Sequence, residues 1–162
     1  MFRLFRKPKK QVEPQSPPVH IPPDLPKGHE TLLVAEDDAA IRVRLALILR
    51  DLGYQVLEAA DGEEALRIAQ NCLAGKIELL VTDMVMPKMN AKELVHRLAE
   101  FSPQTKVIYC SGYPGNLALQ NGIINPEMPY LQKPILPQAL ALKIREVLDD
   151  SNKGPHARSG PF

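Results

Sequence analysis

IELLVTD, residues 77–83, is an apolar run that ends in an aspartate, and this stretch decides the fold. Residues 77–82 have the length of a β-strand and almost no polar interruption. A strand with one solvated face would alternate apolar and polar side chains, whereas a near-continuous apolar run is typical of a sheet that is covered on both faces. We therefore predict a strand of a parallel sheet over 77–82, followed directly by Asp83.

Further strands and helices alternate on both sides of this run. Short apolar runs predict four more strands, over residues 31–35, 54–59, 106–110 and 128–131. Apolar residues at three- and four-residue spacing predict five helices, over residues 39–52, from 61 to about 73, from 90 through 98, over 116–120 and over 136–148. This alternation predicts an α/β fold, a doubly wound five-stranded parallel sheet with five helices.

The ends of the predicted helices carry residues that suit them. Gly53 follows the first helix where a C′ glycine is expected. Asp38 precedes the same helix, and we interpret it as the N-cap. Asp61, Glu63 and Glu64 place acidic side chains at the start of the second helix, where the helix dipole favours them.

Charge is unevenly distributed along the chain of 162 residues, whose formal net charge is +1. The first 12 residues carry five Lys/Arg and no acid, whereas residues 31–150 carry 12 Lys/Arg against 16 Asp/Glu. Residues 1–30 hold seven of the 16 prolines and too little apolar surface to offset the entropy of ordering them. We expect a disordered Pro-rich basic arm over 1–30, one domain over 31–150 and a disordered tail over 151–162.

The basic arm allows two interpretations. Phe2, Leu4 and Phe5 stand among its cations, so it could touch an anionic membrane surface or an acidic partner, although it is too short for stable anchoring. The simpler interpretation is a solvated tail.

Composition and charge argue against a nucleic-acid-binding domain, a membrane-spanning protein and a secreted protein. A nucleic-acid-binding domain usually has a pI above about 9 and a basic face, which this chain does not match. No apolar run reaches the ~18 residues of a membrane span, and no signal-peptide core follows the basic N-terminus. Cys72 and Cys110 lie in apolar stretches without CxxC spacing, as expected for buried thiols in a reducing compartment. We expect a cytoplasmic protein with no direct nucleic-acid contact and no stable membrane insertion.

Polar side chains gather at the ends of the predicted strands. Glu36, Asp37 and Asp38 follow the first strand, Asp83 the third, Ser111 the fourth and Lys133 the fifth. In a doubly wound sheet ligands bind at the carboxyl ends of the strands, which share one edge. Carboxylates brought together repel each other, and a hard divalent cation relieves that repulsion. Mg²⁺ prefers oxygen ligands, so the sequence predicts that Glu36, Asp37 and Asp83 can bind it.

Four stretches together carry a resemblance to a known family. VAEDD (34–38), VTDMVMPKM (81–89), YCSGYPG (109–115) and YLQKP (130–134) stand in order, each at a predicted strand end. With these stretches, residues 31–150 resemble response-regulator receiver domains. The resemblance implies the flavodoxin-like, CheY-like fold.

The resemblance also implies roles for individual residues. Asp83 matches the phospho-acceptor, Glu36 and Asp37 match the acidic pair that binds Mg²⁺, and the backbone carbonyl of Val85 matches a further metal ligand. Ser111 matches the switch hydroxyl and Lys133 the lysine that pairs with the phosphoryl group. Tyr130 falls at the position of an aromatic switch residue, although a plain core or edge tyrosine would explain it too.

Two further details follow from the family pattern. The peptide bond between Lys133 and Pro134 is one that the family usually holds in the cis form, an isomer largely confined to X–Pro bonds. Asn90-Ala91 stands where the family often has a glycine, which is expected to tighten or shift the turn without touching the acceptor.

The function implied is that of a phospho-acceptor in a two-component or phosphorelay system. The expected partners are a sensor histidine kinase or a histidine phosphotransfer protein, and a downstream protein target. The 12 residues after Asp150 are too few for a DNA-binding helix-turn-helix, so we expect output through a protein contact or onward transfer. The SGYPG and YLQKP stretches are similar to receivers attached to hybrid sensor kinases, which favours a relay role.

The sequence argues against two other functions and leaves a third open. An aspartate-nucleophile phosphatase needs a second Asp two residues after the nucleophile, where Val85 stands, so we do not expect an enzyme. A dinucleotide or P-loop site would need GxGxxG or GxxxxGK[ST], which the chain lacks. An unphosphorylated interaction scaffold, a degenerate receiver, is the alternative that stays open. Val85 and Tyr113 lie two residues beyond Asp83 and Ser111, and their bulk predicts slow self-dephosphorylation.

Overall fold

The computed structural model of the chain describes residues 20–72 and 76–150. Its five strands form one parallel sheet in the order β2-β1-β3-β4-β5. The strands are β1 (Thr31–Ala35), β2 (Gln55–Ala59), β3 (Leu79–Asp83), β4 (Lys106–Ser111) and β5 (Tyr130–Gln132). The helices between and after them are α1 (Ala39–Asp51), α2 (Gly62–Gln70), α3 (Ala91–Phe101), α4 (Gly115–Gln120) and α5 (Pro137–Asp149). This is the predicted flavodoxin-like topology, whose strand order reverses between β1 and β3.

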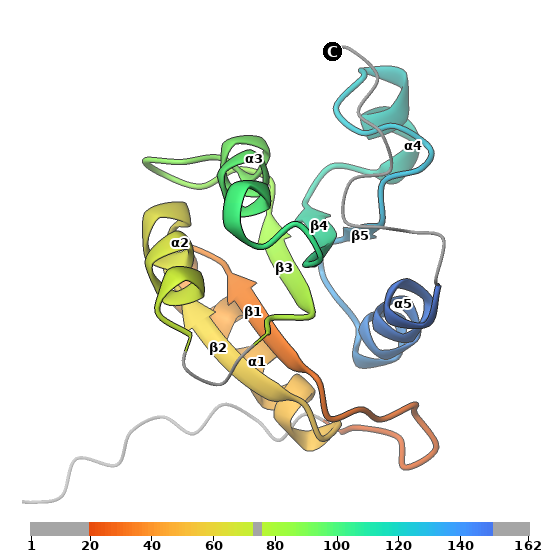
Figure 1. Ribbon diagram of the computed structural model, residues 1–162. Helices are drawn as coiled ribbons and strands as arrows, with labels where there is room; N and C mark the ends of the chain where they lie inside the picture. The colour runs from red at the N-terminus through yellow and green to blue at the C-terminus, as the bar shows by residue number, and fades with distance from the viewer. Residues whose placement is uncertain (1–19, 73–75, 151–162) are drawn as a thin grey trace, which may run out of the picture.

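Helices cover both faces of the sheet, as the apolar strands predict (Figure 1). Successive side chains of a strand point to opposite faces. Leu32 and Val34 of β1 therefore pack with α1 and α5, whereas Leu33 and Ala35 pack with α2 and α3. A smaller cluster holds α4 against the end of β3 through Met84, Ala118 and Ile124. The aliphatic core thus fixes the strand ends from both sides.

The helix ends behave as the sequence predicts. Asp38 is the N-cap of α1, because its carboxylate accepts hydrogen bonds from the backbone N–H groups of Ala40 (2.9 Å) and Ile41 (3.0 Å). Gly53 follows α1 with φ +98°, a conformation that favours glycine. The Lys133–Pro134 peptide bond is cis, as the resemblance implies.

Several strand boundaries differ from the prediction. The third strand was expected over 77–82 and runs over Leu79–Asp83, while the fourth was expected to end at Cys110 and includes Ser111. The fifth, expected over 128–131, runs over Tyr130–Gln132, and the second begins at Gln55 rather than 54. Apolar runs report burial, whereas the strand bounds depend on pairing with the neighbouring strand. Asp83 and Ser111 are consequently the last residues of paired strands, in register with Cys110 and Gln132.

The helix boundaries also differ from the prediction, by one to three residues. Helix α2 ends at Gln70 rather than near 73, a position that lies outside the described residues. Helix α4 begins at Gly115, one residue before the expected start, and α5 is shifted by one residue. In α5 the residue expected to be the first of the helix, Leu136, is its N-cap.

Residues 20–30 pack against the domain, in contrast to the expected disorder of the whole segment 1–30. Leu25 is buried in the α1/α5 core layer, and the Gly28 N–H donates to the carbonyl of Leu52 at 3.1 Å. The Glu30 carboxylate forms an ion pair with Arg145 of α5 at 2.8 Å. The prediction of disorder rested on the high proline content of residues 1–30 and did not take account of these few anchoring residues. The expected basic arm over 1–19 and tail over 151–162 lie outside the described residues.

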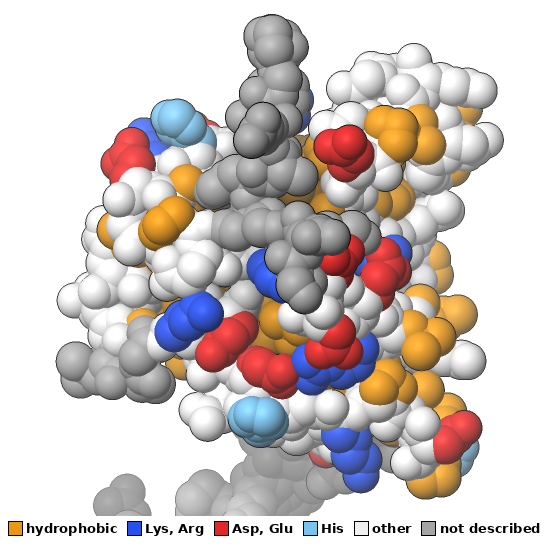
Figure 2. Space-filling model, turned by 45° about the vertical axis from the view of Figure 1, so that its right-hand side comes forward, with side chains coloured by type: hydrophobic (Ala, Val, Ile, Leu, Met, Phe, Trp, Pro, Cys, Tyr) orange, Lys and Arg blue, Asp and Glu red, His pale blue; other side chains and the backbone are white. Residues whose placement is uncertain are grey.

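The described surface is mixed in character. On the face seen in Figure 2, acidic and basic side chains are interspersed and hydrophobic side chains are prominent along the right-hand side. Exposed large hydrophobic residues include Leu117 and Leu119 of α4 and Leu142 of α5. Among the described residues, no helix combines the length and the apolar character needed to cross a membrane.

Candidate functional site

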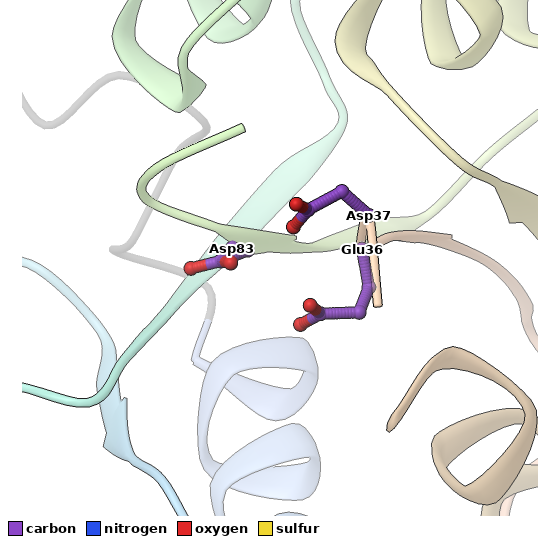
Figure 3. A group of neighbouring side chains, drawn as sticks. All are labelled: Glu36, Asp37 and Asp83. Carbon is purple, nitrogen blue, oxygen red and sulfur yellow. The ribbon is translucent and has the colours of Figure 1, made fainter. Parts of the chain in front are cut away.

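Three carboxylates meet where the strand order reverses. Glu36 and Asp37 follow β1 directly, and Asp83 ends the neighbouring β3, where Ala35 is in register with Thr82. One oxygen from each carboxylate lies within 4.8 Å of the others (Figure 3). The two strands that flank the topological switch therefore bring together the acidic residues that the sequence predicts for a metal.

Glu36 is the most buried member of this group, with 2% of its surface exposed. Its Oε1 accepts a hydrogen bond of 3.3 Å from the Asp38 N–H. Its Oε2 lies 2.7 Å from the Lys133 ammonium as an ion pair, although it has no hydrogen-bond partner of good geometry among the described residues. Burial raises the pKa of Glu36, and the charge of Asp83 raises it further against the opposing effect of Lys133.

Within the described part of the chain, Lys133 is the only lysine whose ammonium contacts these acids. Its Nζ lies 2.7 Å from Glu36 Oε2 and 3.1 Å from Asp83 Oδ2. Its backbone N–H donates to the Ser111 carbonyl at 2.8 Å, which fixes the start of the side chain. Burial would lower the pKa of Lys133, but the two carboxylates outweigh burial and raise it. The ammonium is therefore held in its charged form beside Asp83.

Ser111 and Asp83 line one open cavity of about 490 Å³. The Ser111 side chain is buried, and its hydroxyl oxygen accepts a hydrogen bond of 3.2 Å from the Tyr113 N–H. The cavity is lined by Asp83, Val85, Ser111, Gly112, Tyr113, Pro114, Leu117 and Lys133. A carboxylate, a hydroxyl and an ammonium thus face one space that is large enough for a phosphoryl group.

Tyr130 connects β5 with the loop that carries Ser111. Its half-buried side chain donates a hydrogen bond through the hydroxyl to the Tyr113 carbonyl, and a longer one of 3.4 Å to the Ser111 carbonyl. This bonding pattern places the tyrosine beside the predicted switch hydroxyl. The switching role itself stays a prediction.

The groups that could bind a metal ion are the three carboxylates and the backbone carbonyl of Val85. The Val85 N–H lies 3.4 Å from Asp83 Oδ1, and its side chain is 75% exposed. The proposed ligation through the Val85 carbonyl stays a prediction. The carboxylates of Glu36, Asp37 and Asp83 are hard oxygen donors, and the single ammonium of Lys133, which contacts Glu36 and Asp83, leaves negative charge in excess among these three acids. These residues fit a divalent cation such as Mg²⁺.

Sequence reasoning missed two supporting contacts. The Arg42 guanidinium donates to the Glu36 carbonyl at 2.7 Å and ties the acidic turn to α1. Lys88 forms an ion pair of 2.7 Å with Asp61, 27 residues earlier in the chain. Neither contact has a local sequence signal, because each depends on how separate loops approach one another.

Comparisons with known proteins agree on the family. Residues 32–145 match the family model described as response regulator receiver domain. The chain is 35% identical over 122 residues to the sensor kinase CckA of Brucella abortus. It is 33% identical over 111 residues to the autoinducer 1 sensor kinase/phosphatase LuxN of Vibrio harveyi. These matches cover 75% and 68% of this chain but only 13% and 12% of those longer relatives.

Solved structures point the same way. The receiver domain of the hybrid histidine kinase CckA fits with a TM-score of 0.61 at 36% identity, covering 73% of this chain and 98% of that one. The chemotaxis protein CheY4 of Vibrio cholerae fits with a TM-score of 0.61 at 28% identity, covering 75% and 100%. Family model, sequence and structure agree, and the chain belongs to the response-regulator receiver domain family of two-component systems.

Proposed function

We propose that Asp83 accepts a phosphoryl group in a Mg²⁺-dependent reaction and that the chain acts as a signalling switch or relay. The observation that carries this proposal is the position of the Lys133 ammonium. It lies 3.1 Å from the Asp83 carboxylate, inside a group of three carboxylates that share one strand edge. A lysine fixed there can pair with an oxygen of a phosphoryl group bound to Asp83.

Each side chain has a separate task in the proposed transfer. An Asp83 carboxylate oxygen attacks the phosphorus of a phosphohistidine, forming an acyl phosphate as the N–P bond breaks. The electron pair of that bond leaves with the imidazole nitrogen of the donor. Lys133 pairs with one phosphoryl oxygen, and the Ser111 hydroxyl donates to another. Glu36, Asp37, Asp83 and the Val85 carbonyl would hold Mg²⁺, which when bound neutralises charge on the phosphoryl oxygens.

The same geometry supports a switching role for Ser111 and Tyr130. A Ser111 hydroxyl that donates to a phosphoryl group would still accept from the Tyr113 N–H, so the new bond would draw the Tyr113 backbone with it. Because the Tyr130 hydroxyl donates to the Tyr113 carbonyl, a movement of this loop changes the surroundings of Tyr130. Phosphorylation would then shift the population of two arrangements, read on the surface of α4, β5 and α5.

The proposed partners follow from this chemistry. The donor is a phosphohistidine on a sensor histidine kinase or a histidine phosphotransfer protein, and the readers are downstream proteins. Similarity to the receiver domain of the hybrid histidine kinase CckA supports onward relay. We place the chain in the cytoplasm and as a signalling module rather than an enzyme, without direct nucleic-acid contact or stable membrane insertion.

Intact-mass spectrometry with a small-molecule phosphodonor tests the acceptor chemistry. The proposal expects a gain of about 80 Da that needs both Mg²⁺ and Asp83. Asp83→Ala should abolish the gain, and Asp51→Asn, which alters an exposed aspartate at the end of α1, should leave it intact. No gain together with no binding of a beryllofluoride phosphoryl mimic would favour the alternative, an unphosphorylated interaction scaffold.

A further inference from the structure

We propose that the ion pair between Lys88 and Asp61 positions the metal site by clamping the β3–α3 loop, residues 84–90, onto the start of α2. The inference rests on the proposed function, because the loop acts through the Val85 carbonyl that is predicted to reach the metal. Lys88 and Asp61 are positioning residues, which act through the loop and touch neither the metal nor the phosphoryl group.

The loop contains a strained turn that needs support. Lys88 has φ +66°, and no other non-glycine residue in the described ranges has a positive φ. The Met89 N–H donates to the Pro87 carbonyl at 2.8 Å, so Lys88 is the central residue of a three-residue γ-turn. A γ-turn with positive φ is the rare, strained form, and a residue with a Cβ adopts it only where its surroundings hold it.

The ion pair supplies that support from an anchored partner. Lys88 Nζ lies 2.7 Å from Asp61 Oδ2, while Asp61 Oδ1 accepts the Glu64 N–H at 2.8 Å and caps α2. The Asp61 side chain is 14% exposed and the Lys88 side chain 57%. The Asp61 carboxylate is thus fixed at the start of α2, and the more exposed Lys88 side chain reaches it from the loop.

A second, independent contact holds the same point. A Cβ added at Gly62 would lie 2.8 Å from the Cβ of Met89 and 3.0 Å from its carbonyl oxygen. The loop backbone therefore packs directly on the first residue of α2, and the buried Met89 side chain enters the core between α2 and α3. The far end of the loop is fixed to α2 by an ion pair and by close packing.

The clamp lies five residues after Asp83, on the loop that carries Val85. At its near end the Met84 N–H donates to the Cys110 carbonyl at 2.9 Å. The Val85 N–H contact with Asp83 is long, at 3.4 Å, and so is the bond from the Ala91 N–H to the Met84 carbonyl, so the position of the Val85 peptide depends on the buried Met84 and Met86 beside it and on the anchors at the two ends of the loop. Mg²⁺ demands near-ideal octahedral geometry, and a loosened loop is expected to weaken its binding.

The direction in which Mg²⁺ affinity changes in two variants distinguishes a positioning role of the ion pair from a purely electrostatic one. Lys88→Met removes a positive charge from the loop that follows Asp83, which by charge alone would tighten Mg²⁺ binding. Asp61→Asn keeps the N-cap and removes a negative charge, which by charge alone would weaken it. A clamp predicts weaker binding in both variants.

Calorimetric titration of the metal-free full chain with MgCl₂ tests this prediction. We expect the Kd for Mg²⁺ to rise about three- to tenfold in Lys88→Met and in Asp61→Asn, with no further rise in the double variant. Lys88→Arg, which keeps the cation, should stay within about twofold of the wild type. Lys143→Met, which removes a surface lysine from a 2.7 Å ion pair on α5, should leave Kd unchanged.

A measurement without metal completes the test. Hydrogen–deuterium exchange of residues 84–90 in EDTA should be faster in Lys88→Met and Asp61→Asn than in the wild type and in Lys143→Met. Thermal unfolding in EDTA identifies any variant that has lost its fold. Tighter or unchanged Mg²⁺ binding in Lys88→Met, with wild-type binding intact, overturns the clamp alone. A wild type that binds no Mg²⁺ overturns the proposed function and, with it, the clamp's role at the metal.

Discussion

Lys133 Nζ lies 2.7 Å from Glu36 Oε2 and joins the end of β5 to the end of β1, although β3 and β4 lie between those strands. The same ammonium also reaches Asp83, so it links three of the five strand ends. One lysine faces three carboxylates here, and negative charge remains in excess. This excess of negative charge suits the site to a cation, and repulsion between the carboxylates lowers the stability of the folded protein when no cation is bound.

Glu36→Gln is therefore expected to stabilise the metal-free protein while weakening Mg²⁺ binding. The raised pKa of Glu36, due first to burial, means that its ionised form is disfavoured in the folded state. Removing that charge should raise the free energy of unfolding in EDTA by roughly 1 kcal/mol. Urea unfolding with and without Mg²⁺ measures both effects, and Glu100→Gln, at an exposed glutamate of α3, is the control. A destabilised Glu36→Gln protein in EDTA would mean that the ion pair with Lys133 outweighs the repulsion.

The Glu30–Arg145 ion pair predicts a stability loss in acid. Burial would raise the pKa of Glu30, but the hydrogen bond and charge of Arg145 bring it down to about 2. A carboxyl group with a lowered pKa in the folded state stabilises the protein above its unfolded pKa, and this contribution is lost as the pH falls towards 2. At pH 7, Glu30→Gln should be less stable than the wild type by about 1–2 kcal/mol, a value reduced for partial solvent screening.

Unfolding by urea over a pH series tests this contribution. The difference between the wild type and Glu30→Gln should shrink from pH 5 downwards and be mostly lost as the pH falls through 2. A difference that stays constant over this range would show that Glu30 acts through packing rather than through its charge.

The sequence was sufficient for the fold and for much of the site because both depend on the same apolar strands. Runs such as 77–82 place Asp83 at a strand end, and parallel strands share one edge, so Glu36, Asp37 and Lys133 were brought to it by topology alone. Contacts between separate loops were not predictable. The Lys88–Asp61 pair and the packing of residues 20–30 depend on distances that no local pattern encodes.

Val85→Asn is expected to shorten the lifetime of phospho-Asp83. Val85 and Tyr113 line the cavity beside Asp83 and are 75% and 53% exposed, so their bulk flanks the approach of a hydrolytic water. Neither side chain positions that water as a short polar one could. The substitution should speed dephosphorylation by about tenfold, less than the ~100-fold or more that a general acid or base contributes, because Asn orients the water without taking its proton. A wild-type lifetime of seconds, unchanged in Val85→Asn, would refute slow self-dephosphorylation.

Lys106→Met is expected to destabilise the end of α5. The Lys106 ammonium donates to the carbonyls of Val147 (2.8 Å), Leu148 (3.0 Å) and Asp150 (2.9 Å), where the helix dipole favours a cation. Losing these bonds should lower the free energy of unfolding by about 1–2 kcal/mol. Urea unfolding measures the loss, with Lys143→Met as a matched lysine control. Equal stabilities of the two variants would contradict this capping role.

Chemical localisation of the acyl phosphate identifies the residue that accepts the phosphoryl group. The protein is first treated with a phosphodonor and then with borohydride, which reduces an aspartyl phosphate to homoserine. Tandem mass spectrometry then identifies the residue that has become homoserine. If Asp83 is the phospho-acceptor, homoserine is expected at Asp83 alone, dependent on Mg²⁺ and absent from Asp83→Ala. Homoserine at Asp37 or another acid, or an unmodified Asp83 in a protein that has gained phosphate, would contradict it.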